Sequence, residues 1–357
     1  MASKSALTAD EPLPKILVTG AAGFLGQQVV RCAQAAGAQV HATDRRRDGL
    51  PVDLDFRQAD ICAPETLRGT FAGIDCVVHL AGLAHVFGKS RAVVAPFHKV
   101  NTAGTAHVAR AAAEAGVRAF VLVSSVSVYG RHDAQPVDES FPCYPETPYA
   151  ESKYDAEKRA TEIAKAAGMR LTILRLATLY GEGDPGNVAR LFRAIDRRRF
   201  VWIGDGSNRK SLIHREDAAK ACVTAAMSAM GPAGEVRTYN VAAPPCTMRQ
   251  IVETIADALS RRLPTWRVPA AMAVHGSRVA SMLMFGRTRL GGLPDTLRKW
   301  LAEDTYAGDR FQRAFHFQPE VSLAEGIRRE ANWFRQSATV HRVRRGQAHF
   351  SAATAEK

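Results

Sequence analysis

The sequence predicts an α/β protein built around a doubly wound parallel sheet. In the first half of the 357-residue chain, short and almost continuously apolar segments alternate with alanine-rich segments of helical length. Strands covered by helices on both faces are apolar throughout, and a helical crossover links each parallel strand to the next. The chain also exceeds the length at which a single core usually stops growing, about 250–300 residues. We therefore expect the sheet domain to be followed by a smaller C-terminal α/β lobe.

The expected elements of the first half follow one another in strand–helix order. Pro148 is suited to the first turn of a helix, because its missing N–H has no partner there in any case. In the second half, Thr247–Gln250 and Ser322–Glu325 have the pattern of capping boxes that begin helices. Apolar runs predict strands at Lys15–Thr19, Gln39–Thr43, Cys76–Leu80, Phe120–Val123 and Leu171–Leu174, and one more that ends at or just before Ala59–Ile61. Helices are expected at Phe24–Ala36, Ala95–Glu114 and Tyr149–Ala167.

The chain is strongly basic but carries no nucleic-acid-binding pattern. Its formal net charge is +13, with local basic runs at Arg45–Arg47, Arg197–Arg199 and His341–Arg345. Aromatic residues do not alternate with these runs, so we interpret them as solvated faces and expect no nucleic-acid partner. The alternative is attraction of anionic small molecules such as phosphates.

The cysteines and the apolar segments predict a cytoplasmic protein without a membrane span. The six cysteines are scattered and form no Cys-x-x-Cys pair, so we expect free thiols and no metal site. The polar N-terminus, Met1–Pro14, lacks the apolar core of a signal peptide. Val268–Phe285 is the nearest candidate for a membrane span, but polar residues interrupt it. We interpret it as a buried or interfacial helix, with contact to a membrane surface as the lesser alternative.

A glycine-rich turn follows the first expected strand. Gly20, Gly23 and Gly26 stand in a Gly-x-x-Gly-x-x-Gly spacing between that strand and the first helix. Glycines in such a turn let the backbone approach a pyrophosphate at the helix N-terminus. The strand before and the helix after supply the context that this motif requires. The turn therefore predicts a Rossmann-type dinucleotide-binding domain, with a chance glycine cluster as the alternative.

The expected dinucleotide is NAD. The second strand ends at Asp44, about the distance downstream at which a carboxylate binds the cofactor ribose. A carboxylate there would repel the 2′-phosphate of NADP. Arg45 keeps NADP as an alternative, because a guanidinium could pair with that phosphate. Asp60, followed by Ile61, is placed to accept a hydrogen bond from the adenine amino group, or is simply a polar strand end.

Tyr149 and Lys153 stand four residues apart in the third expected helix. Residues at this spacing project from one face, and a nearby cation lowers the pKa of a phenol. Such a phenol can take a proton from an alcohol or return one to a ketone. Considered alone, the pair could equally be a tyrosine and a lysine on a helix surface.

The ordered set of motifs resembles the extended short-chain dehydrogenase/reductases. The resemblance is strongest to the NAD-dependent nucleotide-sugar epimerase/dehydratase family, of the UDP-glucose 4-epimerase-like type, and it extends from Lys15 to Arg335. The motifs that carry it are the glycine turn, Asp44, Asp60-Ile61, His79–Gly82, Asn101, Ser124–Gly130 and Tyr149–Lys153, and more weakly Leu174–Gly181, Gly204–Ser207, Ile213–Asp217 and Phe317–Trp333.

The resemblance implies a role for each matched residue. Tyr149 is implied to be the acid/base, Lys153 to bind the nicotinamide ribose and lower the phenol pKa, and Ser125 to bind the reacting oxygen. Asn101 matches a structural asparagine at a helix kink. The implied cofactor contacts are Gly20, Gly23, Phe24, Leu25, Gly26, Asp44, Arg45, Asp60, Ile61, Leu80, Ala81, Gly82, Asn101, Tyr149, Lys153 and Leu176. The implied substrate contacts are Ser125, Ser127, Thr178, Asn187, Arg209 and Lys210.

Several of these assignments have a structural alternative. The hydroxyls of Ser124 and Ser127 could simply end a strand, and Asn187 could be a helix N-cap. Thr178 stands where the family has an asparagine that contacts the nucleotide phosphates. Lys210 aligns with the family's phosphate-binding arginine, with Arg209 beside it, and the pair could instead be an exposed basic hairpin.

The resemblance also limits the reaction. Family dehydratases carry an Asp-Glu pair after the catalytic Ser/Thr, whereas Val126 and Ser127 stand here, so dehydration is not expected. An epimerase of a nucleotide-activated sugar needs only the Tyr/Lys/Ser set. A reductase or dehydrogenase of a sugar or a 3β-hydroxysteroid-like alcohol or ketone uses the same residues. The segment Leu263–Arg310 differs from the sugar epimerases and resembles the 3β-hydroxysteroid dehydrogenase-like branch of the superfamily. A non-catalytic NAD-binding regulator is the third alternative.

The expected organisation completes the prediction. Residues 1–14 form a flexible N-terminus, 15–180 the NAD-binding domain and 181–338 the substrate-binding lobe, from which some elements return to the first domain. Residues 339–357 form a basic, disordered tail. The family implies a homodimer formed through two helices of each subunit.

Overall fold

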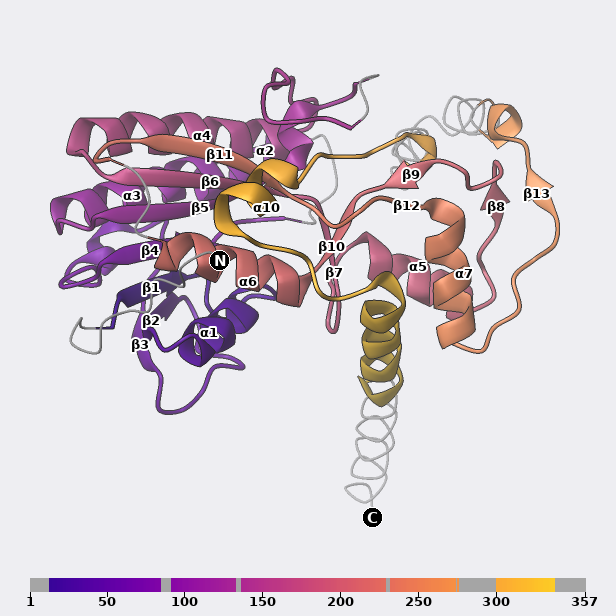
Figure 1. The fold of residues 1–357 in the computed structure, drawn as a ribbon, viewed down its shortest axis with the longest axis horizontal. Helices are drawn as coiled ribbons and strands as arrows, with labels where there is room; N and C mark the ends of the chain where they lie inside the picture. Colours follow the sequence, from indigo (N-terminus) through magenta and orange to yellow (C-terminus); the bar gives the residue numbers. More distant parts are fainter. Residues whose placement is uncertain are drawn as a thin grey trace, which may run out of the picture.

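The protein is built around a parallel sheet of seven strands in the order β11-β6-β5-β4-β1-β2-β3 (Figure 1). The computed structural model describes residues 13–84, 91–132, 136–228, 232–273, 275 and 300–337. The predicted doubly wound sheet is confirmed, and its strands up to β6 lie within a few residues of their expected positions, whereas β11 was not predicted. The strands are β1 (Lys15–Thr19), β2 (Gln39–Asp44), β3 (Asp55–Gln58), β4 (Cys76–His79), β5 (Ala119–Ser125), β6 (Arg170–Leu176) and β11 (Val236–Val241).

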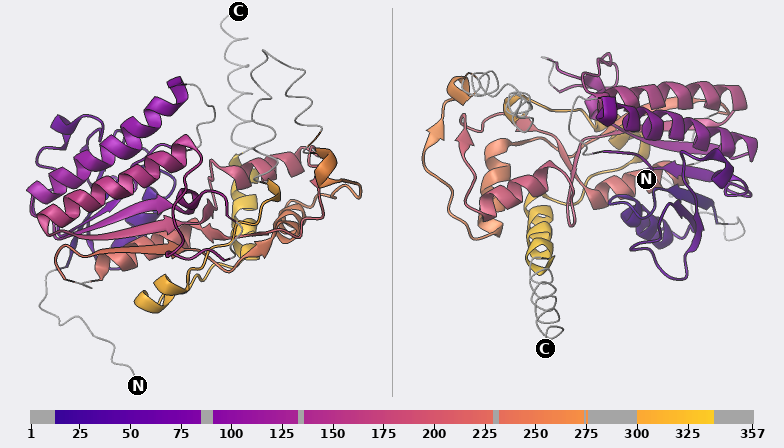
Figure 2. Two further views of the ribbon diagram at one scale, coloured as in Figure 1. Left: turned by 90° about the horizontal axis from the view of Figure 1, so that it is seen from above. Right: turned by 180° about the vertical axis from the view of Figure 1, so that it is seen from behind.

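Helices cover both faces of this sheet (Figures 1 and 2). On one face lie α3 (Gly104–Glu114) and α4 (Pro148–Ala167), packed against side chains such as Leu17 and Val77. On the other lie α1 (Gly26–Ala35) and α6 (Arg215–Met227), packed against Ile16 and Val78. Adjacent strand residues thus enter opposite cores, which explains why the strands are apolar throughout.

Two expected helices begin or run differently from the prediction. The helix α1 begins at Gly26, two residues later than expected, because the glycine turn extends to Leu25. The segment expected as one helix consists of α2 (Arg91–Phe97), a π-helical stretch (His98–Ala103) and α3. Two shorter 3₁₀ turns lie at η1 (Pro64–Leu67) and η3 (Val126–Tyr129).

The second half forms a lobe with a core of its own. Phe192, Ile251 and Ile327 lie in this core, from α5 (Asn187–Asp196), α7 (Met248–Ala258) and the C-terminal helix, residues 323–337. A further short helix, α10 (Asp309–Phe315), packs against β11. Short strands pair two by two: β7 (Thr178–Tyr180) with β10 (Leu212–His214), β9 (Arg209–Lys210) with β12 (Cys246–Thr247), and β8 (Trp202–Ile203) with β13 (Arg267–Val268).

The remaining predictions for this half have mixed outcomes. The Thr247–Gln250 capping box is confirmed. Ser322 accepts the Glu325 N–H, but the Glu325 carboxylate binds Arg328 and Arg329. The helix expected from Val268 is wrong at its start, because Val268 pairs with Ile203 in a parallel strand. Most of that segment, like the N-terminal and C-terminal tails, lies outside the described residues.

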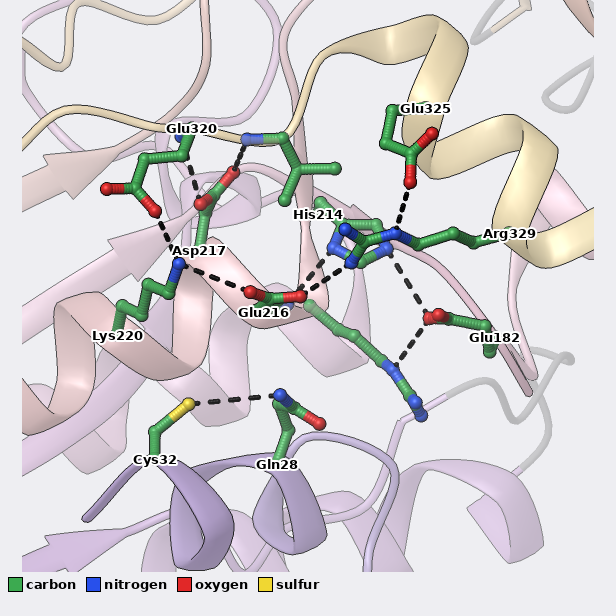
Figure 3. A network of polar contacts seen from close by, with 12 residues as sticks. Gln28, Cys32, Glu182, His214, Glu216, Asp217, Lys220, Glu320, Glu325 and Arg329 are labelled. Carbon is green, nitrogen blue, oxygen red and sulfur yellow. Dashed lines mark hydrogen bonds and ion pairs between the residues drawn. The ribbon is translucent and has the colours of Figure 1, made fainter. Parts of the chain in front are cut away.

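The C-terminal segment is fastened to α6 by charged groups (Figure 3). The buried Asp217 carboxylate accepts the backbone N–H groups of Glu320 and Val321, each at 3.0 Å. Lys220 contacts Glu320 at 2.5 Å, and Arg329 contacts Glu216 at 2.6 Å. The C-terminal helix therefore joins the sheet domain to the core of the second lobe.

Candidate active site

The glycine turn lies at the point where the strand order reverses. β1 is flanked by β2 on one side and β4 on the other, and Thr19 at the end of β1 pairs with His79 at the end of β4. Ligands of doubly wound sheets bind in the crevice outside such strand ends. A Cβ at Gly26 would overlap the Gly20 carbonyl oxygen, so the close approach of turn and helix requires glycine there.

The start of α1 is suited to an anion. Leu25, the N-cap residue, makes no side-chain capping bond, and the first turn holds no acidic residue. The Gln27 and Gln28 N–H groups donate to the Gly23 and Leu25 carbonyls, so an anion is favoured here by the helix dipole and by the lack of an acidic side chain in the first turn. A pyrophosphate of a dinucleotide fits this end of the helix.

Asp44 lies beside the turn, as predicted for a ribose ligand. Its carboxylate accepts the N–H groups of Ala22 at 3.1 Å and Arg45 at 2.6 Å, and the Arg45 side chain is exposed. Asp60 instead binds within its own turn, accepting the Cys62 N–H at 2.9 Å. This contact favours the polar-strand-end interpretation of Asp60, while Ile61 is buried beneath Gly104.

Asn101 holds the loop after β4 against α4. Its side-chain oxygen accepts the Leu83 N–H at 2.7 Å, and its amide donates to the Leu83 carbonyl and the Ser152 hydroxyl. Asn101 is fully buried in the π-helical stretch, and these contacts agree with a structural role at a helix irregularity. Leu80, Ala81 and Gly82 form the loop that it fixes.

Tyr149 lies in the first turn of α4. Thr147 caps this helix by accepting the Ala150 N–H, and Pro148 is its first residue. The Phe97 ring packs edge-on against the Tyr149 ring, with 6.0 Å between the ring centroids. Burial raises the pKa of the phenol, while a hydrogen bond with the Ser125 side chain opposes that rise. The structure therefore brings Ser125 and Tyr149 together. The expected fall in the Tyr149 pKa is wrong for this structure, because burial outweighs every stabilising contact.

Lys153 lies one turn further along the same face of α4, and its side chain is buried. Its Nζ donates to the Val123 carbonyl at 2.6 Å, two residues before Ser125. Burial lowers the pKa of Lys153 to about 8, and the Glu157 carboxylate opposes this. The ammonium is thus directed at the end of β5 that carries Ser125.

Ser124 and Ser127 differ in their surroundings. Ser124 faces the opposite way from Ser125 and donates to the Glu157 carboxylate at 2.5 Å, so its role is structural. The Ser127 hydroxyl is buried and has no partner among the described residues, which agrees with a substrate contact. Neither Glu157 nor its partner Arg175 was singled out from the sequence, although the four-residue spacing from Lys153 to Glu157 is a visible signal.

The remaining expected contacts lie where the chain passes from β6 into the second lobe, with Leu176 expected to contact the cofactor and Thr178 and Asn187 the substrate. Leu176 is buried at the end of β6, and Thr178 is exposed at the start of β7. Asn187 is exposed at the first position of α5, so the N-cap interpretation is wrong. The Asp184 carboxylate caps the start of α5 instead, because it accepts the N–H groups of Gly186 and Ala189.

Arg209 and Lys210 are each placed against a carboxylate. Lys210 is buried and donates to Asp304 at 2.6 Å, while the exposed Arg209 has its Nε 3.6 Å from Glu303. The exposed-hairpin interpretation is therefore wrong for Lys210. A substrate phosphate would have to compete with these carboxylates for both cations.

Two further findings bear on the predictions. Within the described part of the chain, no helix is long and apolar enough to cross a membrane. The described residues also contain no group of His, Cys, Asp or Glu side chains suited to a metal ion.

Comparison with known proteins gives consistent matches. The model of the NAD dependent epimerase/dehydratase family matches residues 16–242. UDP-glucose 4-epimerase of Mycolicibacterium smegmatis is 31% identical, over 91% of this chain and 99% of that protein. The 2-alkyl-3-oxoalkanoate reductase of Stenotrophomonas maltophilia is 29% identical, over 88% of this chain and 98% of that protein. The solved structure of MoeE5 in complex with UDP-glucuronic acid and NAD superposes with a TM-score of 0.71 at 26% identity, covering 90% and 99% of the two chains.

Proposed function

Because this chain belongs to the NAD dependent epimerase/dehydratase family, we propose that it is an epimerase of a nucleotide-activated sugar. One observation carries the proposal. Tyr149 hydrogen-bonds Ser125, and Lys153 binds the Val123 carbonyl two residues earlier in β5, while Val126 and Ser127 supply no acid–base pair for eliminating water. A relative named as a UDP-glucose 4-epimerase supports the same reaction and substrate class.

The residues around the glycine turn fit NAD. The start of α1 would hold the pyrophosphate, and the Asp44 carboxylate would bind the ribose hydroxyls. When bound, NAD would supply the acceptor and later the donor of a hydride. The chain's own residues must then move the matching proton and hold the reacting oxygen.

Tyr149 is the group that moves this proton. Its raised pKa keeps the phenol protonated at neutral pH, the form that donates to a ketone oxygen. Removing a proton from an alcohol requires the phenolate, which the Lys153 ammonium and the Ser125 hydroxyl would stabilise. Ser125 would hydrogen-bond the reacting oxygen. A sugar that turns over between loss and return of the hydride leaves as its epimer.

We also propose the domain division and assembly expected from the sequence. Residues 15–180 would bind NAD and residues 181–338 the substrate, which Ser127 and Thr178 of the first range would also contact together with Asn187 of the second. Two copies would form a homodimer. The independent core of the second lobe supports the division. Light scattering of the purified protein at several concentrations tests the assembly.

The reaction is tested with a panel of UDP-, GDP- and dTDP-sugars, incubated without added NADH. We expect inversion at C4 of at least one sugar, measured by NMR of the sugar. Release of a 4-keto-6-deoxy sugar, or no conversion together with steady NADH consumption on another ketone, would contradict the proposal. Tyr149→Phe serves as the inactive control.

The second candidate is a reductase or dehydrogenase of a more apolar alcohol or ketone. It is favoured by the carboxylates of Glu303 and Asp304, which already neutralise the two cations expected to bind a diphosphate. The relative named as a 2-alkyl-3-oxoalkanoate reductase supports it as well. NADH or NADPH oxidation with a panel of medium-chain ketones would distinguish it from the epimerase. A non-catalytic regulator is disfavoured, since all three catalytic side chains are present.

A further inference from the structure

A buried ion pair lies directly behind Lys153. Glu157 follows Lys153 by one helical turn on α4, so both project from the same face. Arg175 of β6 binds Glu157 through two contacts, Nε to Oε1 at 3.1 Å and Nη2 to Oε2 at 2.7 Å. The side chains are only 8% and 4% exposed, for Arg175 and Glu157 respectively. With Ser124 also donating to Oε1, Glu157 accepts three hydrogen bonds, which hold its carboxylate in place.

The guanidinium of Arg175 is itself fixed in place. It lies over the Tyr129 ring, 4.8 Å from the ring centre, and the Tyr129 hydroxyl donates to the Asn240 side chain at 2.7 Å. Asn240 in turn donates its N–H to Glu139 and its amide to the Val137 carbonyl. The ion pair is thus anchored in β6 and β11, and Arg175 cannot turn away without breaking this arrangement.

The other titratable groups near the pair are neutral or turned elsewhere. Burial lowers the pKa of His79 to about 3, so its imidazole carries no charge. Burial raises the pKa of Cys143 to about 11 and that of Tyr129 to about 12, which keeps both protonated. Glu139, whose pKa is raised by burial, is directed at the Asn240 N–H. Glu157 is the carboxylate that acts on Lys153.

We propose that Glu157 is a positioning residue that keeps Lys153 cationic and directed at the Val123 carbonyl, while Arg175 and Ser124 hold the Glu157 carboxylate in place. Two cations and one anion are buried together, so each charge depends on the other two. Without the Glu157 charge, Lys153 would face only Arg175 and would lose its proton at lower pH. Without Arg175, Glu157 would act on Lys153 alone, and the ammonium would persist to higher pH.

The proposal predicts opposite shifts for two substitutions. The titration of Lys153 is followed by NMR of protein labelled with ¹³C at lysine Cε, the resonance being assigned by its loss in Lys153→Met. In Glu157→Gln we expect the midpoint to fall by at least about one pH unit, a tenfold change in the proton dissociation constant. In Arg175→Met we expect it to rise. In Ser124→Ala, which keeps both charges, we expect a smaller fall.

The control is Glu162→Gln, which removes an exposed acid of the same helix that pairs with Arg159. In Glu162→Gln the midpoint pH of the Lys153 titration should equal that of the unmodified protein. An unchanged midpoint in Glu157→Gln, in a protein that still folds, would overturn the proposal and leave the pair a purely structural feature. If the ion-pair variants do not fold, the midpoint in Ser124→Ala decides in the same way, and no fall there overturns the proposal.

Activity gives an independent readout that rests on the proposed function. The alkaline limb of the pH dependence of kcat should move in the same direction as the Lys153 midpoint in each variant. The NMR titration requires no substrate. A wrong proposed function would therefore leave the expected midpoint shifts in place, whereas a wrong role for Glu157 would remove them.

Discussion

A Cβ atom at Gly20 would lie 2.6 Å from the backbone nitrogen of Ala81. The turn after β1 and the loop after β4 therefore touch backbone to backbone, at the point where the strand order reverses. Gly20 also has a φ of +70°, in the left-handed region that favours glycine. Both the conformation and the contact exclude a side chain at this position.

Gly20→Ala should therefore destabilise the protein and weaken NAD binding. The positive φ costs about 1–2 kcal/mol, and the overlap with Ala81 adds about 1–3 kcal/mol. The matched control is Gly37→Ala, which has a φ of +81° but no atom within 4 Å of the added Cβ. Urea unfolding should show a larger loss of unfolding free energy for Gly20→Ala than for Gly37→Ala. Titration with NADH should show weaker binding only for Gly20→Ala. Equal losses in the two variants would show that the backbone contact is unimportant.

Tyr149→Phe should abolish turnover while leaving NAD binding intact. The substitution removes the proton donor but keeps the ring that packs on Phe97, so the fold should be preserved. A positioned acid–base group contributes about 10²–10⁴-fold to the rate, and kcat should fall by that factor. Tyr154→Phe, on the same helix beside Lys158, is the control and should retain activity. Unchanged kcat in Tyr149→Phe would exclude this phenol as the acid–base group.

The Asp44 carboxylate should make NADH the preferred cofactor. Its two backbone contacts fix it beside the turn, where it would repel a 2′-phosphate. Fluorescence titrations should give a Kd for NADH at least about tenfold lower than for NADPH, a difference of about 1.4 kcal/mol. Asp44→Ala should reduce the ratio of the Kd for NADPH to the Kd for NADH. Arg45→Ala should weaken the binding of NADPH more than that of NADH. Arg46→Ala, an exposed neighbour, should change neither. Tighter binding of NADPH to the unmodified protein would show that Arg45 outweighs Asp44.

The sheet and the glycine turn were predictable because each follows from local chemistry. Apolar runs define the strands of a sheet buried on both faces, and the spacing of Gly20, Gly23 and Gly26 defines the turn. The break in the helix around Asn101 was indicated only by the resemblance, because Asn101 bonds to Leu83 and Ser152, which come from other elements. Propensity within that segment cannot reveal such contacts.

The candidate site divides in the same way. The four-residue spacing of Tyr149 and Lys153 placed both on one helix face, and the resemblance added Ser125. The effect of burial on the Tyr149 pKa was missed, because it depends on how tightly other segments enclose the phenol. The carboxylates beside Arg209 and Lys210 were missed as well, since Glu303 and Asp304 lie far away in the sequence.

Glu330 should make the stability of the protein fall as pH rises. Its side chain is 2% exposed, and its Oε2 has no partner among the described residues. Burial, then the nearby Asp184 charge, raises the pKa of Glu330 to about 9, far above the value of about 4.3 in an unfolded chain. Between these values the folded state holds a proton that the unfolded state has released. The contribution of Glu330 is therefore greatest below the unfolded pKa and is lost as pH rises toward the folded one.

Glu330→Gln removes this titration and should flatten the pH dependence of stability. The difference in unfolding free energy, variant minus unmodified protein, should increase by about 1.4 kcal/mol for each pH unit that the pH is raised. Between pH 5 and pH 8 this amounts to up to about 4 kcal/mol. Urea unfolding at a series of pH values measures the slope. Glu325→Gln is the control, because contacts with Arg329 and Arg328 lower the pKa of Glu325 and its titration lies below this range. Parallel curves for Glu330→Gln and the unmodified protein would mean that Glu330 is already ionised in the fold, with a cation or water at its buried oxygen.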